Sequence, residues 1–480
     1  MKVSKLLTGI IISFLLSGCG TAEVTSAPVS GTEPEKEPPV EERTKIDRFQ
    51  VEERTQIDRI FESYDSNNAP GCATAVYQNG DTLFSKGYGI ANLDYGIPIS
   101  DSTAFYMTSL SKQMTAAAAG LLVVRGELDP NLEVSEYIDD WPDWAAGVKV
   151  EHLFSHTSGL PDVYDLMSIH GISISNVMDL DDYMTVVKMG ESLVFGPESK
   201  YAYNNSDYTA LAYLIEKISG EKFSQYVDQE LFGPLGMHST HFHDDRHHVV
   251  PNRAMSYEKS ANGFRQTYLG NFQGVGPGGL YSTINDWHRW ESFWNGNLEW
   301  NGGISADEAI ELKRMMTTPY VAGGDPLDYG MGLQINTRKG TLENGHSGSF
   351  MGFQTDYRRY PQYGIAMVTL CNRADGNPQQ LNNQMADILL KEHFEAYLSP
   401  YKGTYRSEEL SAEFKVTIEG GKLKLNRRLS PKGFMTETGK DKWSAESLDM
   451  VFKRNGSGEV SSVLLSTSRA LDVEFHRKNE

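Results

Sequence analysis

The sequence predicts an α+β protein with one antiparallel sheet, a helical middle and a small all-β unit at the C-terminal end. An apolar hairpin pattern lies at residues 72–88, and alternating strand-like segments return at residues 330–370. Helical patterns occupy most of the chain between them. Because strand patterns flank a helical middle, we expect a single sheet built from two distant parts of the chain.

Composition places the chain among ordinary soluble globular proteins of two or more domains. It has 480 residues, 11% aromatics and a formal net charge of −20. Such an acidic chain does not suit phosphate contacts, so we expect no nucleic-acid partner. Residues 400–480 instead carry a small excess of basic residues, which indicates a separate unit.

The first residues have the pattern of an export signal. Lys2 and Lys5 precede the apolar run Leu6 to Leu16, which is too short for a comfortable membrane span. The run ends in Leu16-Ser17-Gly18-Cys19, which resembles the lipobox of bacterial lipoproteins, with Cys19 as the lipidated residue. The alternative is an ordinary signal peptide with an incidental cysteine. We favour a signal peptide over residues 1–18 and an exported, membrane-anchored lipoprotein that faces the extracytoplasmic side.

Residues 19–45 are rich in Pro, Glu, Ser and Thr without periodicity and predict a disordered tether. Residues 40–49 are then nearly repeated at 51–60. One helical face collects the apolar side chains of this repeat: Ile46, Phe49, Ile57, Ile60 and Phe61. A coiled arm and an N-terminal helix that packs on the domain both fit, and we favour the packed helix.

The hairpin comprises Cys72 to Tyr77, a turn at Asn79-Gly80 and a strand over 82–88. Cys72 and Cys371 both lie in apolar strand-like segments. Export permits a disulfide between them, but buried free thiols are as frequent in such positions, so both states stay open.

Ser109 and Lys112 stand at the start of an apolar, alanine-rich helical segment that Gly126 ends. At positions i and i+3 they share one helical face, so the amine can reach the hydroxyl. The helix N-terminus would favour a developing anion at Ser109. The spacing alone is weak evidence, because Ser256 and Lys259 repeat it in a polar segment that we interpret as a loop.

Three further segments contain polar residues of interest. Tyr203 and Asn205 precede a helical pattern over 208–218, and His156 follows a short helix, where we interpret it as structural. The histidine-rich segment 238–248 suggests metal, but its spacing fits no defined zinc pattern, and we expect an exposed loop and no functional metal. Residues 274–283 lack the pattern of a phosphate-binding loop and predict a tight turn that passes close to a site.

The C-terminal half of the first domain predicts three strands, at 330–336, 350–357 and 365–370, with Gly345 to Ser349 at the join of the first two. A helical stretch over 379–397 closes this domain, which we delimit as 46–398. Residues 399–480 then predict short strands with turns and a small barrel or sandwich.

The ordered set Ser109-x-x-Lys112, Tyr203-x-Asn205 and His346-x-Gly348 resembles the serine β-lactamase and penicillin-binding protein superfamily, nearest its class C β-lactamase and DD-peptidase branch. The segments 154–160, 278–283 and 345–348 support it, and the likeness covers roughly residues 50–395. It implies the β-lactamase/transpeptidase-like fold, in which an antiparallel sheet flanked by helices joins an all-helical lobe. The segment Tyr401 to Tyr405 resembles the start of the lipocalin-like β-domain appended to many such hydrolases.

The resemblance implies a role for each residue, and no cofactor. Ser109 would be the acylated nucleophile and Lys112 its base, kept partly neutral by burial and neighbouring positive charge. Tyr203 would relay the proton, Asn205 would orient Lys112 and the substrate amide, and His346 and Gly348 would bind substrate. The backbone N–H groups of Ser109 and Ser349 would form the oxyanion hole.

The motif departs from that of class C β-lactamases, which have Lys-Thr-Gly where this chain has His346-Ser347-Gly348. Histidine is mostly neutral at pH 7, and this form resembles DD-carboxypeptidases, D-aminopeptidases and related esterases. We therefore expect a serine hydrolase of D-amino-acid peptides, such as peptidoglycan stem peptides, or of related amides and esters. The alternatives are a true β-lactamase and a non-catalytic penicillin-binding or cell-wall interaction protein. The sequence does not determine the oligomeric state.

Overall fold

The computed structural model describes residues 51–267, 270–296, 303–428 and 433–478. The predicted signal peptide, Cys19, the tether to residue 45, Ile46 and Phe49 lie outside these residues. Among the described residues, no helix combines the length and the hydropathy needed to cross a bilayer.

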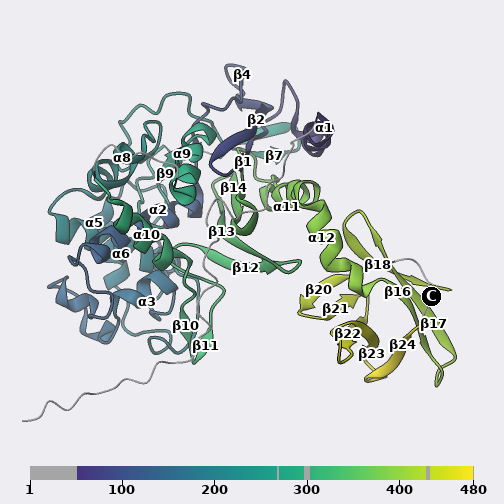
Figure 1. Cartoon of the computed structure of the whole chain (residues 1–480). Helices are drawn as coiled ribbons and strands as arrows, with labels where there is room; N and C mark the ends of the chain where they lie inside the picture. Colours follow the sequence, from purple (N-terminus) through teal and green to yellow (C-terminus); the bar gives the residue numbers. More distant parts are fainter. Residues whose placement is uncertain (1–50, 268–269, 297–302, 429–432, 479–480) are drawn as a thin grey trace, which may run out of the picture. The chain divides into compact units, whose positions relative to one another are not determined.

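A six-stranded antiparallel sheet forms the centre of the first domain, with strand order β12-β13-β14-β15-β1-β2 (Figure 1). The N-terminal hairpin therefore adds to strands from the other end of the domain, as predicted. The strands are β1 Cys72–Gln78, β2 Asp81–Tyr88, β12 Gln334–Arg338, β13 Thr341–Phe350, β14 Phe353–Tyr360 and β15 Ile365–Cys371.

Helices cover both faces of this sheet, which explains why β1 is apolar almost throughout. Ala73, Ala75 and Tyr77 point into the core of the helical lobe, whereas Cys72 and Val76 point into a second core. The helices of the second core are α1 Val51–Ile60, α11 Pro378–Leu389 and α12 Lys391–Leu398. Helix α1 thus packs on the domain, which confirms the packed helix and not the coiled arm.

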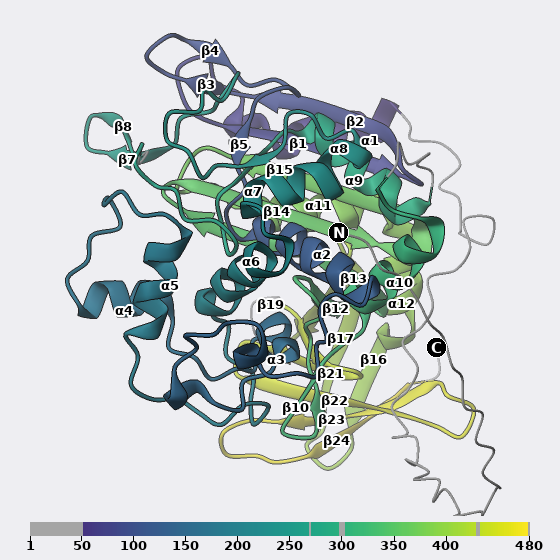
Figure 2. The same ribbon diagram turned by 90° about the vertical axis from the view of Figure 1, so that its left-hand side faces the viewer.

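The helical lobe covers the opposite face, and its central pair is α2 Ser111–Val124 and α6 Asn205–Ser219. Figure 2 shows these two helices side by side. The four buried alanines from Ala116 to Ala119 give α2 a smooth surface for close packing. The other helices are α3 Val150–Ser155, α4 Val163–Ile169, α5 Leu180–Lys188, α7 Phe223–Val227, α8 Gly233–Leu235, α9 Ile284–Asn295 and α10 Ala306–Thr317.

The strands predicted between residues 330 and 370 differ in part from those of the structure. Residues 330–333 are not strand, and β13 is a ten-residue strand, so Gly345 to Ser349 lie within a strand and not at a join. Two glycines weaken the local strand signal, but β13 pairs with β12 on one side and β14 on the other. Tertiary pairing therefore overrides the local propensity.

The C-terminal domain is a nearly closed antiparallel barrel of nine strands, with order β19-β18-β17-β16-β24-β23-β22-β21-β20. Alternate residues such as Tyr405, Val416, Leu425 and Val463 fill its core. The strands are β16 Gly403–Ser407, β17 Ala412–Glu419, β18 Lys422–Arg427, β19 Gly433–Phe434, β20 Thr436–Gly439, β21 Lys442–Ala445, β22 Leu448–Arg454, β23 Val460–Ser466 and β24 Val473–Arg477.

Short strands correct two further predictions. His241 lies in a strand and His243 is buried against Tyr281, so the histidine segment is not simply an exposed loop. Ser256 lies outside any helix or strand, as predicted, but Lys259 lies on the strand that follows, so this second Ser-x-x-Lys lacks helical spacing. These strands are β3 Ile90–Asn92, β4 Ile97–Pro98, β5 Phe105–Tyr106, β6 His241–Phe242, β7 Tyr257–Ser260, β8 Gly263–Gln266, β9 Leu280–Ser282, β10 Val321–Ala322 and β11 Asp325–Pro326.

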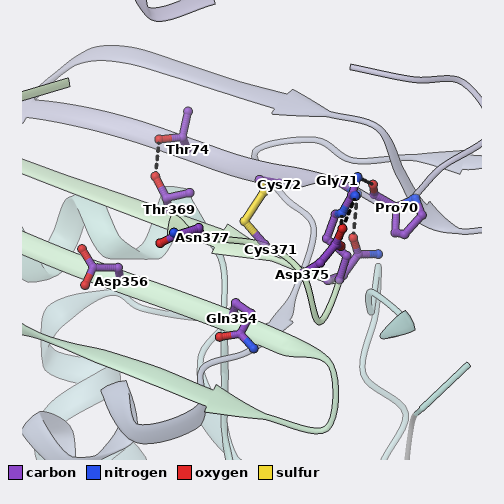
Figure 3. The surroundings of a disulfide bond; sticks show 12 residues. Pro70, Gly71, Cys72, Thr74, Gln354, Asp356, Thr369, Cys371, Asp375 and Asn377 are labelled. Carbon is purple, nitrogen blue, oxygen red and sulfur yellow. Dashed lines mark hydrogen bonds and ion pairs between the residues drawn. A yellow bond between two sulfur atoms is a disulfide. The ribbon is translucent and has the colours of Figure 1, made fainter. Parts of the chain in front are cut away.

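A disulfide joins Cys72 to Cys371, which decides the question that the sequence left open. The two residues are directly opposite each other in the register of β1 and β15, and their Cα atoms are 4.0 Å apart. Figure 3 shows the bridge across the neighbouring strands and, farther along the same pair, the hydrogen bond between Thr74 and Thr369. The bridge closes a loop of 299 residues between the two halves of the sheet.

Candidate active site

Ser109 lies in a tight turn that leads directly into α2. A 3-10 turn over Thr108–Leu110 precedes the first residue of α2 at Ser111, so the predicted helix start is confirmed to within two residues. Thr108 has φ +53°, which is unfavourable for a β-branched residue. Its hydroxyl contacts the Thr355 hydroxyl at 2.8 Å, and its carbonyl accepts from Ser111 Oγ at 2.6 Å. Surrounding hydrogen bonds therefore hold a strained residue next to the serine.

Lys112 is completely buried and its amine is directed at Ser109. Nζ lies 3.4 Å from Ser109 Oγ, 3.0 Å from Asn205 Oδ1 and 3.1 Å from the Pro277 carbonyl. Burial lowers the pKa of Lys112 to about 7, although the charge of Asp162 acts in the opposite direction. The expected partial neutrality is therefore present through burial alone, and the expected neighbouring positive charge is not its cause.

Tyr203 and Asn205 approach the same amine. The Tyr203 ring centroid is 4.7 Å from Lys112 Nζ. Although Tyr203 is 41% exposed, burial raises the pKa of its phenol, while a hydrogen bond with Ser109 opposes the shift. Asn205 is the first residue of α6, and its backbone N–H and Nδ2 donate to Asp162 Oδ2 at 2.7 and 2.9 Å. These two hydrogen bonds orient the Asn205 side chain so that its Oδ1 faces Lys112.

Strand β13 passes directly beside the serine. A Cβ atom at Gly348 would lie 1.8 Å from Thr108 Oγ1 and 2.6 Å from the backbone nitrogen of Ser109, so only glycine fits. Ser349 follows on the same strand. The structure thus brings Gly348 and Ser349 to the Ser109 turn.

His346 lies two residues before Gly348 and is 2% exposed. Its Nδ1 is 2.6 Å from the Ser347 carbonyl and its Nε2 is 3.1 Å from the Tyr329 hydroxyl. Burial, followed by the charge of Lys112, lowers the pKa of His346 to about 3. The ring is therefore neutral at pH 7, as its residue type predicted.

The glycine-rich segment 274–283 passes close to Lys112, in keeping with the predicted turn beside a site. Besides the Pro277 carbonyl, the Gly276 carbonyl accepts from Thr115 Oγ1 and the Gly279 N–H donates to the Tyr106 hydroxyl. The backbone therefore passes within hydrogen-bond distance of Lys112.

Sequence reasoning missed several residues behind the site. His156 is completely buried with φ +58°, and its ring contacts Asp207 Oδ2 and the Tyr329 hydroxyl. Asp162, which holds Asn205, is the N-cap of α4. A capping aspartate and a buried histidine carry no local mark of a site, and only their contacts in the folded chain reveal them.

The histidine-rich segment is where the sequence suggested a metal. Across the described ranges, no group of three His, Cys, Asp or Glu side chains is arranged to hold a metal ion. His241 and His243 contact each other at 3.4 Å, and burial lowers the pKa of each to about 4. Both rings are neutral at pH 7.

Residues 57–390 match the family model described as Beta-lactamase. A D-aminopeptidase of Gluconobacter oxydans is 26% identical over 410 residues, which cover 82% of this chain and 75% of the relative. Penicillin-binding protein 4* of Bacillus subtilis is also 26% identical, over 76% of this chain and 86% of its own.

Solved structures agree at the level of the fold. The octameric penicillin-binding protein homologue from Pyrococcus abyssi has a TM-score of 0.60 at 22% identity and covers 88% of this chain and 99% of its own. A D-amino acid amidase from Ochrobactrum anthropi has a TM-score of 0.57 at 19% identity, over 72% and 99%. With the family match over most of its length, this chain belongs to the beta-lactamase family, is a serine hydrolase, and has relatives named as D-aminopeptidases and penicillin-binding proteins.

Proposed function

We propose that this protein hydrolyses amides or short peptides of D-amino acids that carry a free α-amine, through an acyl-enzyme on Ser109. The observation that carries the proposal is the set of short contacts that the buried Lys112 Nζ makes with Ser109 and Asn205. With a pKa of about 7, Lys112 is half neutral at neutral pH and can accept the serine proton. The family relatives named D-aminopeptidase support the reaction class.

The remaining steps follow from the same geometry. The Ser109 hydroxyl attacks the amide carbon as its proton passes to Lys112, and the amine leaves with a proton relayed by Tyr203. Water then cleaves the ester, and Ser109 regains its proton. Backbone N–H groups of Ser109 and Ser349 would stabilise the oxyanion, each contributing roughly 3 kcal/mol.

Charge favours a substrate amine over a substrate carboxylate. His346 occupies the position of the lysine in class C β-lactamases, and with a pKa of about 3 it forms no ion pair with a carboxylate. Asp162 places a negative charge next to Asn205. This distribution of charge around the site fits an aminopeptidase or amidase better than a carboxypeptidase or a β-lactamase.

A small aromatic cavity of about 20 Å³ lies at the end of β13, and an apolar substrate side chain would have to widen it to enter. His346, Gly348 and Phe350 are alternate residues of β13 and therefore face the same side of the sheet. Phe350 contacts Phe272 and Tyr106, with ring centroids 5.0 and 5.9 Å apart. The cavity is lined by Tyr106, His243, Phe272, Gly279, Tyr281, Phe350, Met351 and Phe353.

The test is intact-mass analysis of the full chain in mild detergent with D-phenylalanine amide, a D-Ala-D-Ala peptide and a fluorescent penicillin. We expect turnover of the amide, with Ser109→Ala inactive but folded. Turnover of the D-Ala-D-Ala peptide with a stable penicillin adduct would favour the penicillin-binding relative's class instead. A transient adduct with loss of antibiotic would indicate a β-lactamase. If no probe reacts, the alternative of a non-catalytic binding protein still stands.

We also propose that the protein is exported and anchored by a lipid on Cys19. The Leu16 to Cys19 motif supports this, and a disulfide between Cys72 and Cys371 suits an oxidising compartment. Detergent phase partition compares the parent with Cys19→Ala. We expect the variant to leave the detergent phase, and an unchanged partition would contradict the anchor.

A further inference from the structure

Four buried side chains form a continuous line behind the catalytic serine. Asp207 Oδ2 is 3.0 Å from His156 Nδ1, His156 Nε2 is 3.3 Å from the Tyr329 hydroxyl, and that hydroxyl is 3.1 Å from His346 Nε2. The first three residues are completely or almost completely buried. In such surroundings each donor must meet an acceptor, so the positions of the protons can be deduced.

The deduction starts at His346. Its Nδ1 lies 2.6 Å from the Ser347 carbonyl, which only accepts, so Nδ1 carries the proton. The ring is neutral, and Nε2 is then an acceptor that takes the hydroxyl proton of Tyr329. Tyr208, a neighbour of Tyr329, donates its hydroxyl proton to the Phe154 carbonyl, so it donates none to the Tyr329 oxygen. The Tyr329 oxygen must therefore accept from His156 Nε2–H.

The other nitrogen of His156 faces two groups. The backbone N–H of Asn204 donates to His156 Nδ1 at 3.2 Å, so Nδ1 is an unprotonated acceptor. Asp207 Oδ2 also approaches Nδ1 at 3.0 Å, and an ionised carboxylate would place two lone pairs against each other. The contact is favourable when Oδ2 carries a proton, while Oδ1 accepts from Ser158 Oγ.

We propose that Asp207 is held as a neutral carboxylic acid and is a positioning residue that orders the hydrogen bonds from His156 through Tyr329 to His346. The chain fixes the tautomer and orientation of His346 on the strand that carries Gly348 and Ser349. It also keeps a negative charge away from Lys112, whose amine must lose its proton to act as a base. Burial, which raises the pKa of Asp207 and lowers that of His156, supports this assignment.

Other titratable groups face the pair from several elements: Lys112 of α2, Asp162 before α4, Tyr201 and Tyr203 before α6, and Tyr208 within α6. The Lys112 charge and the Asp162 charge act on Asp207 in opposite directions. The side chains that contact the Asp207 carboxyl group at hydrogen-bond distance are those of Ser158 and His156, and not those of Lys112 and Asp162.

The first measurement is infrared spectroscopy of the full chain at pH 8. A protonated carboxylic acid has a C=O band at higher frequency than any carboxylate. We expect such a band in the parent that Asp207→Asn removes, and Asp286→Asn, a buried carboxyl outside the site, is the control that leaves the Asp207 band in place. If the difference spectrum shows only carboxylate bands lost, Asp207 is ionised and the proposal is wrong.

The second measurement is the pH profile of Ser109 acylation, and it rests on the proposed function. Asn has the shape of a protonated aspartic acid, with an amide donor for His156 and an oxygen for Ser158. Asp207→Asn should therefore acylate within about threefold of the parent, with the same pH midpoint, whereas Asp207→Ala and Tyr329→Phe should lose about tenfold or more.

An ionised Asp207 predicts a different profile. Its removal would then lower the pKa of Lys112 and move the midpoint of Asp207→Asn down by about one pH unit or more. That shift would overturn the proposal. If no probe acylates Ser109 in the parent, the proposed function fails, while the infrared band still decides the state of Asp207.

Discussion

Replacing Gly348 with alanine tests whether strand β13 must touch the Ser109 turn. The added Cβ would lie 1.8 Å from Thr108 Oγ1 and 2.6 Å from the Ser109 backbone nitrogen. Thr108 could rotate only by giving up its contact with Thr355. The backbone nitrogen has no such freedom, so the strand and the turn must separate by roughly 0.8 Å to reach ordinary contact.

That separation is large for a catalytic site and small for the fold. A misplacement of about 1 Å near reacting groups costs on the order of 100-fold in rate, so we expect Ser109 acylation to fall by about that factor. Overpacking costs about 1–3 kcal/mol of unfolding free energy, which a domain of this size tolerates. The assay pairs acylation kinetics with a urea unfolding curve.

The matched control is Gly196→Ala, because a Cβ at Gly196 meets nothing within 4 Å and its φ is not positive. This variant should acylate like the parent. If Gly348→Ala acylates within about threefold of the parent and is equally stable, β13 does not press on the Ser109 turn as described, and the assignment of Ser349 to the oxyanion site loses its support.

Three further predictions test the base, the subsite and the disulfide. The acylation rate should rise with pH and level off above about 7, because only neutral Lys112 accepts a proton; a rate independent of pH between 5 and 9 would rule out this base. Phe350→Ala should lower kcat/KM for D-phenylalanine amide by about tenfold more than for D-alanine amide, and equal losses would place the side chain elsewhere. Reduction or Cys72→Ser should cost roughly 2–5 kcal/mol of unfolding free energy in urea, since the bridge closes a 299-residue loop, and an unchanged midpoint would contradict this role.

Much of the fold was predictable because its signals are local. The Asn79-Gly80 turn sets the register of β1 and β2, and both residues adopt the positive φ that the turn requires. The Ser109 and Lys112 spacing placed the amine beside the hydroxyl because a helical turn dictates it. The short strands predicted within residues 399–480 are also local: in β17 the apolar residues Phe414, Val416 and Ile418 alternate with polar ones.

The rest depended on contacts between distant residues, which no local pattern records. Strand β13 escaped prediction because its glycines suit a loop until β12 and β14 pair with it. The state of Cys72 was open until the register placed Cys371 opposite it.

The sequence alone therefore determined the candidate reactive groups and the local elements that carry them. The tertiary structure decided their chemistry. It lowers the pKa of Lys112 by burial, turns Asn205 through Asp162, and lines up Asp207, His156 and Tyr329 behind His346. Desolvation and hydrogen-bond partners depend on which residues the folded chain brings together, and those residues are separated here by up to 234 positions in the chain, from Lys112 to His346.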